Sequence, residues 1–161
     1  MVVSGSESPV VEVTWDGRRI ADDFPRGSMV VVYRRRAPAL GRAPVEVLLL
    51  HRAHEGPEHE GDWAWTPPSG ARQPGEDVLA GAVRELREEA GLVLPVTSVS
   101  SGVPEWAVWI ALWDGSPVRL DADTDLLEHD RYIWTTPERA LELVRPAVVT
   151  ESLAMALRRI Q

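Results

Sequence analysis

Residues 70–92 read GARQPGEDVLAGAVRELREEAGL, and the spacing of their apolar side chains predicts an amphipathic helix. The apolar residues recur at intervals of three and four, which places them on one stripe of a helix: Leu79, Ala82, Val83, Leu86 and Ala90. Gly91 follows at the position where a left-handed residue commonly ends a helix. We therefore expect a helix over residues 76–90, preceded by a loop that begins at Gly70.

Three glutamates border this apolar stripe. At 100° per residue, Glu85, Glu88 and Glu89 fall within roughly 100° of one another and form one patch. Like charges at this spacing repel one another, and a hard divalent cation with oxygen ligands would compensate the repulsion. A solvated helix face is the alternative, since Arg84 and Glu88 form an i,i+4 pair. The spacing alone leaves both interpretations open.

The composition excludes several kinds of chemistry. The 161 residues include 25 acidic and 17 basic ones, a formal charge of −8, and every basic residue is arginine. Without cysteine the chain has no thiol nucleophile, disulfide or zinc knuckle, and without lysine it has no Schiff base and no phosphate loop ending in lysine. The acidic balance argues against broad binding to nucleic acids or anionic membranes. We expect an anion to be bound through metal ions or a few arginines.

The rest of the chain predicts one mixed α/β domain over residues 10–161, behind a flexible tail at 1–9. Residue patterns predict strands at 10–15, 28–34, 45–51, 63–66, 92–99, 106–113, 118–120 and 131–134. They also predict helices at 138–144 and from the cap Thr150 to about residue 160. Neither a secretory leader nor a membrane-spanning stretch is recognisable, and we expect a cytoplasmic protein. The sequence leaves a homodimer open.

The order of residues around the helix resembles the signature of the Nudix hydrolase family. The matching positions are Gly70, Glu76, Arg84, Glu85, Leu86, Glu88, Glu89, Gly91 and Leu92. The resemblance implies an α/β fold, a Nudix-type α/β/α sandwich with a mixed β-sheet and a loop–helix–loop metal site. It also implies hydrolysis of a nucleoside diphosphate linked to another moiety, with Mg²⁺ or Mn²⁺ as cofactor.

The same resemblance assigns roles to individual residues. The metal ligands would be the Gly70 carbonyl and the carboxylates of Glu85, Glu88 and Glu89, and one of these glutamates would also be the general base. Arg84 would orient the carboxylates through charge-assisted hydrogen bonds, and Glu76 would support the loop. Glu128 is a further candidate ligand or base, and Glu105 is the alternative base.

Flanking segments resemble the animal-type asymmetric diadenosine tetraphosphate hydrolases and the related nucleoside triphosphate and dihydroneopterin triphosphate pyrophosphohydrolases. They read WTPPSG at 65–70 and EHDRYIW at 128–134, and the resemblance extends over about residues 27–158. Ser69 departs from the lysine of the first group, so a phosphate contact there is lost or supplied by an arginine. A dinucleoside polyphosphate is the leading substrate. The alternatives are nucleoside triphosphates (including oxidised ones), ADP-ribose, sugar nucleotides, capped or triphosphorylated RNA, or nucleotide sensing without turnover.

Aromatic and histidine side chains complete the list of candidates. We expect Trp109 to stack on a nucleobase, with Ser69 and Arg34 also contacting substrate. Trp106 and Trp113 are expected partly in the core, and Tyr132 and Trp134 are expected to pack on the sheet. The three histidines of the first half are expected at the surface: His51, His54 and His59.

Overall fold

The computed structural model describes residues 12–38, 40–53, 55–99 and 105–161. The predicted tail and His54 lie outside these residues. The strands are β1 (Gly27–Arg35), β2 (Val45–Arg52), β3 (Trp65–Thr66), β4 (Ser69–Ala71), β5 (Thr97–Val99), β6 (Trp106–Leu112) and β7 (His129–Thr135). The helices are α1 (Val78–Ala90), α2 (Pro137–Leu143) and α3 (Ala147–Ile160). Among these helices, none is long and apolar enough to cross a membrane.

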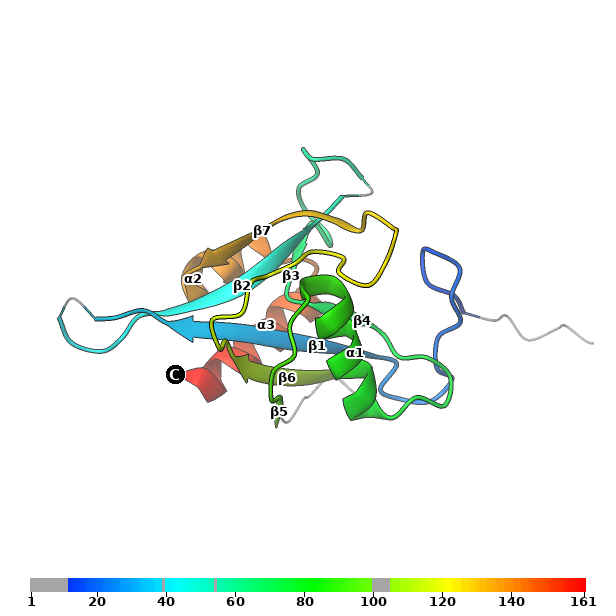
Figure 1. Ribbon diagram of the computed structural model, residues 1–161, viewed down its shortest axis with the longest axis horizontal. Helices are drawn as coiled ribbons and strands as arrows, with labels where there is room; N and C mark the ends of the chain where they lie inside the picture. Colours follow the sequence, from blue (N-terminus) through cyan, green and yellow to red (C-terminus); the bar gives the residue numbers. More distant parts are fainter. Residues whose placement is uncertain (1–11, 39, 54, 100–104) are drawn as a thin grey trace, which may run out of the picture.

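The seven strands form one mixed sheet. β1 lies at its centre and pairs in parallel with β6 and antiparallel with β2 and β4 (Figure 1). β2 also pairs antiparallel with β3 and β7, and β5 lies beyond β6. The parallel β1–β6 pair requires a crossover, and α1 lies in the connection that provides it.

One edge of β1 is shared between two partners. Its first residues, 27–29, pair with β4, and its last residues, 33–35, pair with β2. Between them, the Val30 N–H donates to the Pro68 carbonyl at 2.8 Å. Pro67 and Pro68 therefore connect β3, which pairs with β2, to β4, which pairs with β1. This connection places β4 in contact with α1.

Two apolar cores lie on opposite faces of the sheet, which confirms the expected α/β/α sandwich. Under α1, Ala82, Leu86 and Ala90 pack against Val30 and Leu48. On the other face, α2 and α3 pack on a second set that includes Met29, Val31, Leu49, Val108, Leu153 and Leu157. Residues of β1 and β2 alternate between these cores, as the two-residue period of a strand requires.

Several predicted boundaries were wrong. The strand predicted at 92–99 begins only at Thr97, because Pro95 has no N–H to donate to a ladder. The last helix begins at Ala147, three residues before its expected cap Thr150, which therefore lies inside it. Strand β4 was not expected after two prolines, residues 118–120 form no strand, and residues 12–15 contribute only a bridge.

Candidate active site

Helix α1 is held at both ends by its own sequence. The Asp77 carboxylate accepts a hydrogen bond from the Ala80 N–H at 3.2 Å, and this N-cap starts the helix two residues later than predicted. Gly91 adopts φ 65°, and its N–H donates to the Arg87 carbonyl. Leu79, expected on the buried stripe, is 46% exposed in the first turn. The buried stripe turns the adjoining glutamates toward β4.

Arg84 connects these glutamates to the loop before the helix. Its guanidinium binds both carboxylate oxygens of Glu76, at 2.7 and 3.0 Å. It also donates to Glu85 at 2.8 Å and to Glu88 at 3.0 Å, and a further bond reaches the Ala71 carbonyl. Hydrogen bonding to Arg84 lowers the pKa of Glu76. One rigid planar cation thus orients three carboxylates.

Strand β4 lies directly against two of the helix carboxylates. The Glu89 carboxylate accepts a hydrogen bond from the Ser69 N–H at 2.8 Å. A Cβ added at Gly70 would collide with the carboxyl group of Glu85, so a larger residue here would displace that carboxylate from its hydrogen bond with Arg84. The close approach of strand and helix therefore depends on the missing side chain of Gly70.

The environment raises the pKa of both buried carboxyl groups in the metal-free protein. Burial raises the pKa of Glu85 to about 7, although the charge of Arg84 acts in the opposite direction. Burial also raises the pKa of Glu89 well above its usual range, and the charges of Glu85 and Glu128 add to the effect. Burial thus outweighs the one positive charge, Arg84, that contacts Glu85, and it disfavours the ionised form of both carboxyl groups.

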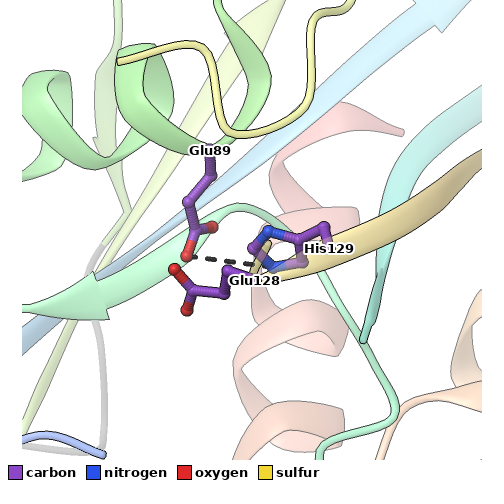
Figure 2. Close-up of side chains that lie close together, drawn as sticks. All are labelled: Glu89, Glu128 and His129. Atoms are coloured by element: carbon purple, nitrogen blue, oxygen red, sulfur yellow. Dashed lines mark ion pairs between the residues drawn. The ribbon is translucent and has the colours of Figure 1, made fainter. Parts of the chain in front are cut away.

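The loop after β6 brings a second group of residues to the site. The Asp121 carboxylate accepts the backbone N–H groups of Glu128 and His129, each at 2.9 Å, and it pairs with the His129 ring at the same distance. The backbone N–H of Asp121 in turn donates to the Glu89 carbonyl at 3.1 Å. Figure 2 shows the result: Glu128 and His129, at the start of β7, face Glu89 of α1.

The residues present fit a divalent cation. Ligand atoms of Glu89, Glu128 and His129 lie within 4.8 Å of one another, and Glu85 and Glu88 lie on the adjoining helix surface, where Arg84 binds both. Oxygen donors dominate the set, as Mg²⁺ and Mn²⁺ prefer. A bound cation would supply further positive charge to this group of carboxylates, of which Arg84 contacts only Glu85 and Glu88.

A pocket of about 330 Å³ opens over these carboxylates. Seven residues of the predicted site line this pocket: Ser69, Gly70, Arg84, Glu85, Glu88, Glu89 and Glu128. Its other walls include Trp63 and Trp106, whose ring centroids are 6.3 Å apart, and Arg52, whose guanidinium lies over the Trp63 ring. Arg18 and Arg19 of the N-terminal segment also line it. The pocket is thus lined by glutamates on one side and includes arginines among its other lining residues.

Two predicted substrate-binding residues lie elsewhere. Trp109 is not among the pocket residues, because its strand turns it into the core under α1. Arg34 binds Glu46 at 2.7 Å and lies over the Trp134 ring, so its charge is used in the sheet. Trp106, which we expected partly in the core, is half-buried and also lines the pocket. The Glu105 side chain is exposed and is also absent from the described pocket lining.

The remaining aromatic and histidine predictions had mixed outcomes. Trp113 and Trp134 pack together in the core under α1, as expected, while Tyr132 is 40% exposed. His51 is fully buried rather than at the surface, because hydrogen bonds to Asp130 and to the His59 carbonyl satisfy its ring. Sequence reasoning gave no site role to Arg52, Trp63, Asp121 or His129, although His129 stands in the quoted segment 128–134.

Comparison with known proteins agrees with this architecture. The family model described as the NUDIX domain matches residues 23–153. The chain is 30% identical to a pig bis(5′-nucleosyl)-tetraphosphatase [asymmetrical] over 130 residues, covering 74% of this chain and 84% of the relative.

Solved structures agree as well. A binary complex of the Caenorhabditis elegans Ap4A hydrolase superposes with a TM-score of 0.62 at 26% identity, covering 84% of this chain and 98% of the other. The Escherichia coli dihydroneopterin triphosphate pyrophosphohydrolase shares the fold, with a TM-score of 0.59 at 18% identity over 86% of this chain and 99% of the other. The chain therefore belongs to the Nudix family and is a hydrolase that acts on acid anhydrides of nucleotides.

Proposed function

We propose that this protein hydrolyses a phosphate anhydride of a nucleoside polyphosphate with Mg²⁺ or Mn²⁺, and that a dinucleoside polyphosphate is its preferred substrate. The observation that carries the proposal is the meeting of the α1 glutamates with Glu128 in one pocket that also contains Arg52. The names of the pig relative and of the C. elegans structure support the choice of substrate.

The reaction requires an activated water and neutralised phosphate. The water oxygen forms a bond to one phosphorus, the bridging P–O bond breaks, and the released phosphate keeps the electron pair. The proton of the water passes to a carboxylate, for which Glu85, Glu88, Glu89 and Glu128 are the candidates. Bound divalent cations would neutralise phosphate oxygens and lower the pKa of the water.

The protein's own residues would hold and orient these components. Glu85, Glu88 and Glu89, with the Gly70 carbonyl, are the proposed metal ligands. Arg84 orients Glu85 and Glu88, and the Ser69 N–H orients Glu89. A fixed ligand set loses little entropy when a cation binds. Glu128 lies in the loop directly before β7, apart from the helix that supplies the other carboxylates.

Substrate contacts would come from the opposite walls of the pocket. Arg52 lies at the end of β2, and its buried Nε has no hydrogen-bond partner among the described residues. We assign to it the phosphate contact that Ser69 cannot make. Trp63 and Trp106 offer flat rings on which a nucleobase can stack. Trp63 holds φ 63°, an uncommon value for a bulky residue, and such strain is often found at functional sites.

The test is a substrate panel with separated products. Diadenosine tetraphosphate, ATP, 8-oxo-dGTP, ADP-ribose and triphosphorylated RNA are incubated with Mg²⁺, Mn²⁺ or EDTA, and the products are resolved by chromatography. We expect ATP and AMP from diadenosine tetraphosphate at the highest kcat/KM, with no product in EDTA. Water labelled with ¹⁸O identifies the attacked phosphorus. Nucleotide binding without any turnover would overturn the proposal in favour of a sensing module.

A further inference from the structure

The His129 ring is buried and oriented by a carboxylate. The residue is 1% exposed at the first position of β7. Its Nδ1 lies 2.9 Å from the Asp121 carboxylate, which also accepts two backbone N–H groups. A carboxylate whose oxygens accept these backbone N–H groups also accepts from the ring, so Nδ1 carries the hydrogen and Nε2 presents its lone pair.

That lone pair faces carboxylates. Nε2 has no hydrogen-bond partner among the described residues, and the nearest Glu89 oxygen is 4.0 Å away, too far for a hydrogen bond. Glu128 completes the group, and Figure 2 shows both carboxylates in front of the ring. A buried lone pair against two acidic side chains is unfavourable unless a proton or a metal cation lies between them.

His51 shows that burial of a histidine in this fold does not require such an arrangement. It is also buried, and its Nδ1 also lies near a carboxylate, that of Asp130 at 2.8 Å. Its Nε2, however, is 2.8 Å from the His59 carbonyl oxygen, so each ring nitrogen has an acceptor within hydrogen-bond distance. The two histidines differ in one respect: only the Nε2 of His129 is left open toward acidic groups.

We propose that His129 Nε2, Glu89 and Glu128 form a mixed nitrogen–oxygen site that favours a transition ion such as Zn²⁺ or Co²⁺ over Mg²⁺. The 4.8 Å spread of the ligand atoms is comparable to two metal–ligand bonds of about 2.0–2.2 Å. Imidazole is a better ligand for Zn²⁺ and Co²⁺ than for Mg²⁺. Asp121 then acts as the outer partner that metal-binding histidines commonly have.

This site shares Glu89 with the metal set of the proposed function, and in that respect it rests on that function. The proposed ligands on α1 are all oxygen atoms, and His129 would add one nitrogen ligand from β7. The consequence is selectivity among cations at one position, while Glu85 and Glu88 remain an all-oxygen set suited to Mg²⁺. Metal binding can therefore be tested without any measurement of turnover.

The experiment is proton NMR of the EDTA-stripped full chain loaded with Co²⁺. A histidine bound through Nε2 should give an exchangeable Nδ1–H signal that is shifted by the paramagnetic ion, and the chain has only four histidines. We expect this signal in the wild-type protein and in the matched control His51→Gln, and its loss in His129→Gln. Calorimetry should show Co²⁺ affinity reduced at least about 10-fold in His129→Gln, with Mg²⁺ affinity changed less.

A second variant covers the case in which His129→Gln does not fold. Asp121→Asn keeps an oxygen for the backbone N–H groups, but its amide would donate to Nδ1 and move the ring hydrogen to Nε2. It should therefore also lose the shifted signal. A signal that persists in either variant, or that is absent from the wild type, overturns the proposal. If the signal fails this test but the protein hydrolyses substrate with Mg²⁺, only the His129 metal site is contradicted. If the His129 signal is present but no substrate is hydrolysed, only the proposed function is contradicted.

Discussion

Helices α1 and α3 cover opposite faces of the same sheet with similar lengths, 13 and 14 residues, but they bury different chemistry. α1 buries two glutamates, Glu85 and Glu89, beside its alanines and leucine. α3 buries only apolar side chains and Ser152. One face of the sheet therefore contributes stability, and the other accepts buried charge at a cost in stability that function requires.

The largest expected effect separates function from stability on α1. Glu88→Gln or Glu89→Gln should lower kcat by at least about 100-fold, because a charged group acting on the transition state is lost. Neither variant should unfold the chain, since glutamine at position 89 can still accept the Ser69 N–H. Steady-state kinetics and thermal unfolding measure the two quantities. Glu142→Gln on the exposed part of α2 is the control, and unchanged turnover in either α1 variant would refute the metal assignment.

The converse is expected on α3. Leu153 is fully buried in the core on that face, so Leu153→Ala should lower the free energy of unfolding by about 2–5 kcal/mol. Because this core lies across the sheet from the glutamates, kcat at a temperature where the variant stays folded should match the wild type. Urea denaturation and kinetics test both statements. The control is Leu40→Ala, at a position that is 96% exposed. A large fall in kcat would contradict the division of labour between the two faces.

The pH dependence of stability tests the cost of burying Glu85 on α1. The pKa of Glu85 rises from 4.5 to about 7 on folding, so the folded protein retains a proton that the unfolded chain releases. The metal-free protein should therefore lose stability as pH rises from about 4.5 to 7. Unfolding measured in EDTA across this range should show a steeper loss for the wild type than for Glu85→Gln. Parallel curves would contradict the assigned shift.

The smallest effect concerns the one polar side chain that α3 buries. The Ser152 hydroxyl has no hydrogen-bond partner among the described residues. Ser152→Ala removes a group without leaving any partner unsatisfied, so stability should change by less than about 1 kcal/mol or increase. Thermal unfolding beside Leu153→Ala is the measurement. A loss as large as that of the leucine variant would mean that the hydroxyl has a structural role that this face was not expected to contain.

Local sequence predicted much of this molecule because some of its determinants lie close together in the chain. The N-cap Asp77, the apolar spacing and Gly91 together specify α1, and the strands β1 and β2 contain buried apolar runs. Strand β4 escaped prediction because its pairing depends on β1, which is more than 40 residues away. Pattern reasoning also placed Trp109 in the pocket, although strand alternation directs it to the opposite side from Val108 and into the core.

The sequence by itself determined the family and the acidic helix, because the residues that carry both lie within 70–92. Only the tertiary structure decided what faces that helix. Arg52, Trp63, Glu128 and His129 come from segments that are distant in sequence, and the divergence of β2 from β1 and the Asp121 hydrogen bonds bring them together. The periodicity of a segment does not indicate which distant residues its side chains contact. The orientation of His129 toward Glu89 could therefore be known only from the folded chain.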